Sequence, residues 1–122
     1  MKAKLYFFLF LFSYCVFSQE LPPIVKYAST TYRAGNQNWM ISQDANQYVF
    51  FANNEGLLEF NGSNWELYPS PNETIVRSVK VIGNKIFTGC YMEFGFWIRQ
   101  SNGKLKYTSL SQTIKKIGRA HV

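Results

Sequence analysis

The sequence has little of the residues on which most catalytic and metal sites depend. Its 122 residues include two cysteines, Cys15 and Cys90, and one histidine, His121. Cys15 lies in an N-terminal apolar segment that we expect to be removed, so Cys90 has no partner for an internal disulfide. We expect Cys90 to be a small buried hydrophobic residue rather than a reactive thiol. His121 lies in a C-terminal segment that is set aside below. Without it the sequence offers no histidine-based triad, no cysteine pair and no metal-binding cluster.

Carboxylates are also few, and their spacing forms no catalytic motif. Hydrolysis by paired carboxylates needs two of them about 5–10 Å apart in one cleft. The seven acidic residues are Glu20, Asp44, Glu55, Glu59, Glu66, Glu73 and Glu93. Glu93 stands out, because it lies between Met92 and Phe94, and a carboxylate among apolar residues needs a partner. We favour a structural partner over a catalytic role, and we predict no catalytic residues, no cofactor, no metal and no enzymatic activity.

Positive charge is present but not concentrated. The formal net charge is +6, and removing Lys2, Lys4 and Arg119 near the two ends from the 13 basic residues leaves 10 against seven acidic ones. A surface that binds nucleic acid needs Lys and Arg clustered on one face. Among the remaining basic residues only Lys115 and Lys116 are adjacent. This chain is therefore not expected to bind nucleic acid itself.

Residues 1–18 have the pattern of a secretory signal peptide. Lys2 and Lys4 supply a charged start, an apolar run follows over residues 5–16, and Ser18 is a small residue at the expected cleavage site. No second apolar stretch of about 18 residues follows. The alternative is a buried or membrane-anchored N-terminal helix. We expect an exported protein.

Residues 117–122 match, codon for codon, the translation of a common sequencing-adapter stretch. Segments of this kind are excluded from arguments about the fold. On this interpretation His121 carries no chemistry, and the gene continues beyond Lys116. The alternative is that these six residues are a native tail.

The central part of the chain contains one pattern written almost twice. Equivalent positions recur at intervals of 38 to 40 residues: Ile41 and Val79, Gly56 and Gly95, Trp65 and Leu105. Each copy holds four short apolar or alternating runs, at residues 39–44, 48–52, 56–60 and 65–68, then at 76–81, 85–89, 94–98 and 105–108. Four strands in a period of about 40 residues are typical of a β-propeller blade. We predict an all-β fold with about two four-stranded blades of a partial β-propeller.

Turn residues set the boundaries of these units. We expect a lead-in segment at residues 19–37, a first blade at 38–69 and a second blade at 75–109, separated by the proline-rich stretch 69–72. The lead-in could supply a strand that closes a last blade, and helix should be almost absent. Adjacent blades should press six aromatic residues together: Trp39, Phe50, Phe60, Phe87, Phe94 and Trp97. Two blades leave two outer faces open, so we expect the isolated chain to be marginally stable.

Three motifs carry a family resemblance. They are residues 38–44, residues 51–62 with the pattern Ala-Asn-x-x-Gly-Leu-x-x-Phe-Asn-Gly, and residues 91–97. With them the chain resembles the N-terminal region of the two-component-regulator propeller proteins of Bacteroidetes-type bacteria. Residues 77–95 are similar to a subgroup that ends in a LuxR-type helix-turn-helix. The resemblance implies many blades, a triple-tyrosine immunoglobulin-like domain, one membrane span and a cytoplasmic helix-turn-helix or histidine kinase.

The resemblance leads to an expected function. The chain would be the N-terminal fragment of a periplasmic ligand-sensing propeller, in a membrane-spanning signalling protein that regulates transcription. Its partners would be the remaining blades, an extracellular ligand such as an oligosaccharide, DNA through a cytoplasmic domain only, and a second copy in a homodimer. The alternative is an exported carbohydrate-binding module or an extracellular propeller enzyme without signalling output. The ligand-binding residues stay unknown; Tyr91 or Tyr68 could stack on a sugar or be ordinary strand residues.

Overall fold

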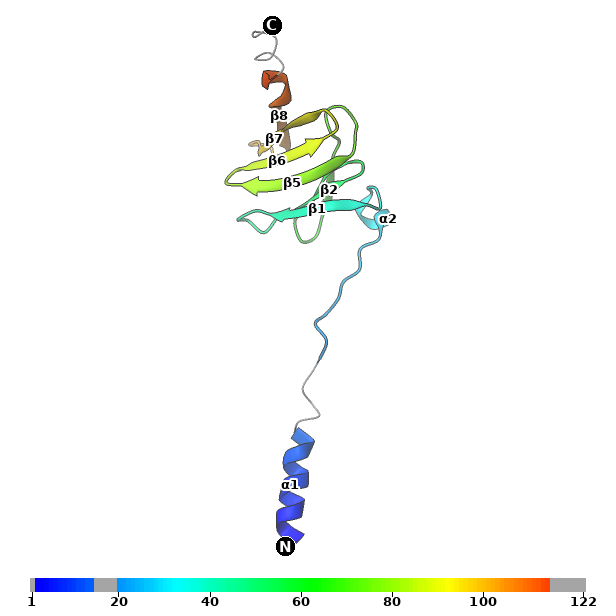
Figure 1. The fold of residues 1–122 in the computed structure, drawn as a ribbon, viewed down its shortest axis with the longest axis vertical. Coiled ribbons are helices and arrows are strands. Elements are labelled where there is room, and N and C mark those ends of the chain that lie inside the picture. The colour runs from blue at the N-terminus through cyan, green and yellow to red at the C-terminus, as the bar shows by residue number, and fades with distance from the viewer. Residues whose placement is uncertain (1, 15–19, 115–122) are drawn as a thin grey trace.

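The computed structural model describes residues 2–14 and 20–114. Two helices, α1 (Lys2–Tyr14) and α2 (Ser29–Tyr32), precede the strands, and α1 exposes its apolar side chains. No helix among the described residues has the length and apolar character needed to span a membrane. The remaining fold is mostly β, as predicted for the all-β class, with two sheets packed face to face (Figure 1).

Each sheet is a four-stranded antiparallel meander in chain order. The first sheet contains β1 (Asn38–Gln43), β2 (Val49–Asn53), β3 (Gly56–Phe60) and β4 (Trp65–Tyr68). The second contains β5 (Val76–Ile82), β6 (Lys85–Cys90), β7 (Glu93–Arg99) and β8 (Leu105–Ser109). All eight predicted strands are present, each with its ends within one residue of the expected position.

The turns form where Asn, Asp and Gly predict them. Asp44 Oδ1 accepts hydrogen bonds from the backbone N–H groups of Asn46 and Tyr48, each at 2.9 Å. Asn61 Oδ1 caps the β3–β4 hairpin in the same way, since the backbone N–H of Asn64 donates to it at 2.7 Å. The stretch between β4 and β5 lies outside both sheets, as its prolines require. Asp44 is therefore a turn residue.

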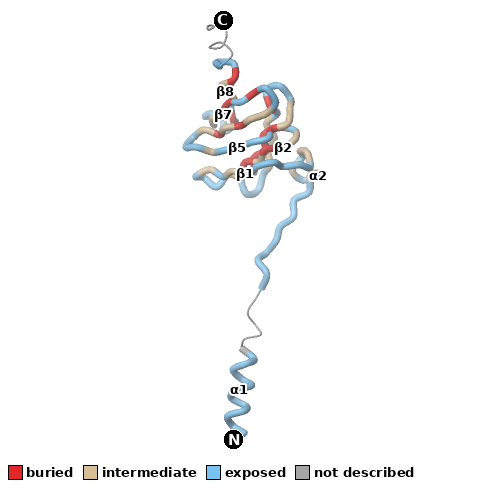
Figure 2. Tube along the Cα trace, viewed as in Figure 1, coloured by how far each residue is buried: buried red, intermediate tan, exposed pale blue. Residues whose placement is uncertain are grey.

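The core lies between the two sheets (Figure 2). Phe50 and Leu57 of the first sheet are fully buried against Val79, Ile86 and Trp97 of the second. The strands β1 and β5 run side by side (Figure 1). This packing removes most of the large apolar side chains on the facing surfaces from water, which is the main stabilising contribution in such a fold.

The prediction of six core aromatics is only partly correct. Phe50 and Trp97 are buried, whereas Trp39 and Phe94 are 43% and 41% exposed. Trp39 lies at a register shift at the start of β1, and Phe94 points to the side of the second sheet that faces away from the first. Phe60 and Phe87 are half-buried.

Residues 27–37 pack against part of the first sheet without adding a strand to it, whereas residues 20–26 are exposed. The rings of Tyr27 and Tyr32 pack on Trp65, with centroids 5.2 and 5.4 Å away. The buried Asn53 side chain bonds to the backbone N–H and carbonyl of Gly35 at 3.0 and 2.8 Å. This segment therefore adds no strand to either described sheet, and its suggested role in closing a last blade stays a prediction. The predicted near-absence of helix beyond α1 holds, apart from α2 and the helical residues 111–114.

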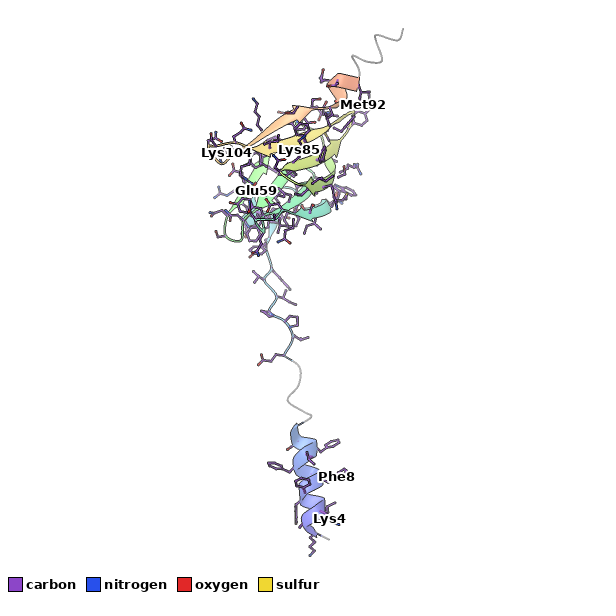
Figure 3. The ribbon with its side chains drawn as sticks, turned by 90° about the vertical axis from the view of Figure 1, so that its left-hand side faces the viewer. Lys4, Phe8, Glu59, Lys85, Met92 and Lys104 are labelled. Atoms are coloured by element: carbon purple, nitrogen blue, oxygen red, sulfur yellow. The ribbon has the colours of Figure 1, made fainter. Side chains whose placement is uncertain are left out.

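Two ion pairs join the sheets at the edge marked by Glu59 and Lys104 in Figure 3. Arg99 Nη2 lies 2.6 Å from Glu59 Oε2, and the two side chains are 32% and 9% exposed. Lys104 Nζ lies 2.7 Å from Glu66 Oε1, and both of those side chains are largely in solvent. The two pairs therefore differ chiefly in how far water screens them.

We expect the Arg99–Glu59 pair to contribute more to stability than the second pair. In a double-mutant cycle with Arg99→Met and Glu59→Gln, the coupling free energy should be about 1–2 kcal/mol, because the carboxylate is buried. Urea unfolding followed by circular dichroism measures it. The cycle of Lys104→Met and Glu66→Gln is the matched control and should give a clearly smaller coupling; equal values would contradict the assignment.

Candidate functional site

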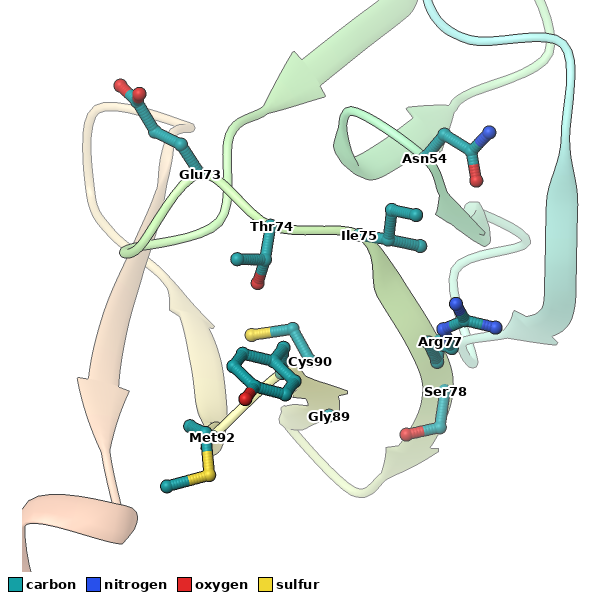
Figure 4. Close-up of a pocket in the computed structure, with 10 residues that line it drawn as sticks. Asn54, Glu73, Thr74, Ile75, Arg77, Ser78, Gly89, Cys90 and Met92 are labelled. Carbon is teal, nitrogen blue, oxygen red and sulfur yellow. The ribbon is translucent and has the colours of Figure 1, made fainter.

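A pocket of about 760 Å³ opens at one end of the two sheets. It lies where the β2–β3 turn, the β4–β5 connection and the β6–β7 turn come together (Figure 4). The lining is more apolar than polar, and Arg77 is its one basic side chain among the described residues. Connections at the end of a rigid sheet scaffold are common places for binding residues. We call this site the Arg77 pocket.

A β-bulge in each sheet brings Trp39 and Arg77 together beside this pocket. The register of β1 shifts between Asn38 and Met40, and that of β5 shifts between Val76 and Ser78. Trp39 and Arg77 are the residues within those shifts. A bulge turns a side chain away from the regular alternation of its strand. Equivalent bulges in the two sheets therefore place one side chain from each sheet at the same end of the fold.

The resulting contact combines a ring, a cation and an amide. The guanidinium carbon of Arg77 lies 4.6 Å from the centre of the Trp39 ring, a distance at which a cation–π attraction is effective. Trp39 Nε1 donates a hydrogen bond to Asn54 Oδ1 at 2.8 Å, and Asn54 lines the pocket. Arg77 and Asn54 thus form one wall (Figure 4).

The opposite wall is built by the β6–β7 turn. Tyr91 and Met92 are 74% and 67% exposed, and Met92 has a positive φ of 57°. Asn72 Nδ2 donates to the Tyr91 carbonyl at 2.7 Å and ties this turn to the β4–β5 connection. The backbone of Tyr91 is therefore held at the pocket, and its ring faces solvent. Tyr68, the other aromatic candidate, is partly buried against the core with its ring 5.6 Å from that of Trp97, and it does not line this pocket.

Cys90 lies in the floor of the Arg77 pocket and is half-buried. Its Sγ–H donates to the carbonyl oxygen of Glu93 at 3.4 Å. Burial raises the pKa of the thiol above its ordinary value, which lowers the fraction of reactive thiolate at neutral pH. The geometry agrees with the prediction that Cys90 is a packing residue rather than a nucleophile.

Glu93 has the structural partners that the sequence led us to expect. Its Oε1 accepts hydrogen bonds from Tyr107 Oη at 2.8 Å and Ser109 Oγ at 2.5 Å, and its Oε2 accepts one from Ser111 Oγ at 2.6 Å. Nothing in the sequence spacing identified these hydroxyls, because β8 approaches β7 only in the folded sheet. The cluster ties the end of β8 and residue 111 to the β6–β7 turn.

Burial, then the hydrogen bond to Glu93 and the charge of its carboxylate, raise the pKa of Tyr107 well above 10. The folded protein therefore keeps a phenol proton that the unfolded chain loses near pH 10, so stability is complete below pH 10 and falls as pH rises beyond it. Tyr68 shifts in the same direction. We expect the free energy of unfolding to drop as the pH rises above about 10, as measured by urea titrations. Tyr107→Phe should flatten that drop; an unchanged slope would exclude Tyr107 as its source.

The other candidates give no second site. No group of three or more His, Cys, Asp or Glu side chains is placed to hold a metal ion among the described residues. His121 and residues 117–122 lie outside the described residues. Comparison with known proteins gives no match: no family model matches the chain, and no curated protein or solved structure is similar to it.

Proposed function

We propose that the two sheets are successive blades of a β-propeller, in the ligand-sensing region of an exported, membrane-spanning signalling protein. Residues 1–18 would be the signal peptide, 19–37 the lead-in, and 38–69 and 75–109 the blades. The Arg77 pocket would take part in ligand binding on the periplasmic side. A helix-turn-helix or kinase in a separate cytoplasmic domain would carry the output, and the complete protein would be a homodimer. The observation that carries the proposal is the repeated geometry of the sheets.

The third strand of each sheet contains a glycine in similar surroundings, Gly56 in β3 and Gly95 in β7. A Cβ atom on Gly56 would lie 2.2 Å from the carbonyl oxygen of Tyr68, and one on Gly95 would lie 2.2 Å from that of Thr108. In both sheets the backbone of the fourth strand therefore approaches the third strand closely at a glycine, where no side chain is present. Together with the equivalent bulges, these contacts make the second sheet a structural repeat of the first.

The way the sheets stack also supports blades. The first strands β1 and β5 lie side by side, and the backbone N–H of Val81 donates to Ser42 Oγ at 3.0 Å between them. In a propeller the blades surround a central channel. β1 is largely exposed along its length, which fits a strand beside a solvent-filled channel.

The Arg77 pocket suits an oligosaccharide. Tyr91 and Trp39 offer exposed aromatic surface, on which the apolar face of a sugar ring can pack. Arg77 and Asn54 supply polar side chains that can hydrogen-bond to hydroxyl groups. A mostly apolar concave surface with a few polar groups is typical of a ligand site.

The proposal is tested by extending the reading frame beyond residue 116. We expect further repeats of about 40 residues, then a membrane span and a helix-turn-helix or kinase. A paired-carboxylate motif or an extracellular tail in place of the span would favour the exported enzyme or carbohydrate-binding module instead.

Binding through the Arg77 pocket has its own test. With an oligosaccharide that changes tryptophan fluorescence, Tyr91→Ala and Arg77→Ala should each weaken binding about tenfold, which corresponds to about 1.4 kcal/mol. Tyr27→Ala, which removes an aromatic ring outside this pocket, is the control and should bind like the parent chain. Equal binding by all four proteins would exclude the pocket as the ligand site.

A further inference from the structure

The outward side of the second sheet carries both phenylalanine and lysine. Strand alternation directs the side chains of these residues away from the first sheet, and the cross-strand pairs place them on one face. We define the lysine face by six of them: Lys80, Lys85, Phe87, Phe94, Phe96 and Lys106. Lys85 is marked on this sheet in Figure 3.

The lysine face is apolar in its middle and open to solvent. Phe94 is 41% exposed, and the rings of Phe87 and Phe96 are tilted against each other with centroids 5.8 Å apart. The ammonium of Lys85 lies 4.6 Å from the centre of the Phe96 ring. A cavity of about 200 Å³ opens between Lys80, Phe87 and Phe94. Exposed apolar patches bordered by charge mark interaction surfaces.

The strand register shows which part of the first sheet corresponds to this face. Phe96 follows Gly95 as Leu57 follows Gly56, and Leu57 is fully buried against the second sheet. Lys106 corresponds to Glu66. Glu66 lies two residues before Tyr68, whose carbonyl oxygen approaches Gly56. Lys106 lies two residues before Thr108, whose carbonyl oxygen approaches Gly95. The lysine face is therefore the counterpart of a surface that is already covered in the first sheet.

The charge of this surface is reversed between the two sheets. On the first sheet Glu59 and Glu66 form ion pairs with Arg99 and Lys104, which the second sheet supplies. At the corresponding places the second sheet has Ile98 and Lys106, with Lys80 and Lys85 nearby. A covering sheet with cations like those of the second sheet would be repelled here, whereas one with carboxylates would be attracted.

We infer that the lysine face is the docking surface for a further sheet that presents apolar side chains and carboxylates. This inference rests on the proposed stacking of sheets and adds the chemistry of the next one. A second copy of this chain does not fit. The three carboxylates on the described strands, Glu59, Glu66 and Glu93, all bond on the inner sides of the sheets. Two lysine faces brought together would repel each other.

A charge-reversed copy of the chain provides the probe. The variant K80E/K85E/K106E keeps the phenylalanines of the lysine face and carries glutamates in place of its lysines. It is co-expressed with a tagged parent chain, and the amount retained on the tag is measured. We expect the parent to retain at least ten times more of this variant than of an untagged parent chain. The difference in retention between the charge-reversed variant and the untagged parent chain should fall at least tenfold in 1 M NaCl, where charges are screened within a few ångströms.

Three outcomes of this experiment decide the inference. The control K26E/R33E/R77E reverses the same number of charges away from the lysine face and should be retained no better than the parent. Equal retention of parent and charge-reversed chains, or retention of neither, would overturn the inference. If the charge-reversed chain is retained but the extended reading frame holds no further sheet, the docking chemistry stands and the proposed function fails.

Discussion

Replacing Gly95 with alanine is expected to lower the free energy of unfolding by about 3 kcal/mol, near the upper end for an added methyl group in a packed site. The new Cβ would lie 2.2 Å from the carbonyl oxygen of Thr108 and 2.5 Å from Tyr107 Oη. Both distances are far inside van der Waals contact. β7 and β8 must therefore separate, and the hydrogen bond from Tyr107 to Glu93 is strained with them.

The measurement is urea unfolding followed by far-ultraviolet circular dichroism. Gly83→Ala is the matched control, because Gly83 has a positive φ of 61° but no atom within 4 Å of its added Cβ. That variant should lose only about 1–2 kcal/mol, from the left-handed backbone alone. Gly56→Ala should lose at least as much as Gly95→Ala, because Gly56 has the same close approach and also a positive φ of 149°. Similar losses at positions 83 and 95 would mean that the close crossing of the strands is not a determinant of stability.

Replacing Trp97 with alanine should have the largest effect of any single substitution in the core, about 3–5 kcal/mol. Trp97 is only 5% exposed. Its ring lies 5.6 Å from that of Tyr68 and 5.0 Å from that of Tyr107, and its Nε1 donates to Thr88 Oγ1 at 3.0 Å. The alanine variant would have a large cavity between the sheets. The hydroxyl group of Thr88 would also lose its hydrogen bond from Trp97.

Trp39→Ala is the control for this substitution, since it removes the same side chain from a position that is 43% exposed. The loss there should be about 1 kcal/mol, mostly from the contact with Arg77. Thermal unfolding of the two variants at one protein concentration makes the comparison. An equal loss for both would contradict the assignment of Trp97 as the centre of the interface.

The strands could be predicted from the sequence because their signals are local. An apolar run that alternates with polar residues and ends at Asn61-Gly62 or Gly83-Asn84 needs no distant partner to be identified as half of a hairpin. The same holds for Asp44, whose side chain bonds within its own turn. Strand ends were therefore correct to one residue.

The candidate site could not be predicted in the same way, because its contacts join distant parts of the chain. Trp39 meets Arg77 across two sheets, and the side chains of residues within a bulge do not follow strand alternation. Tyr27 and Tyr32 find Trp65 only after the lead-in folds back on the first sheet. The exposure of Phe94 depends on what covers the second sheet, and local periodicity contains no information about that.

The paired bulges have one more consequence. Trp39 and Arg77 sit at matching places in the two sheets, yet neither belongs to the buried layer that holds the sheets together. A substitution at either position changes the surface of the proposed ligand pocket and leaves the layer around Phe50 and Trp97 intact. If the pocket binds the ligand as proposed, its specificity can therefore change by substitution of a single residue in each sheet. Such substitutions would have little effect on folding.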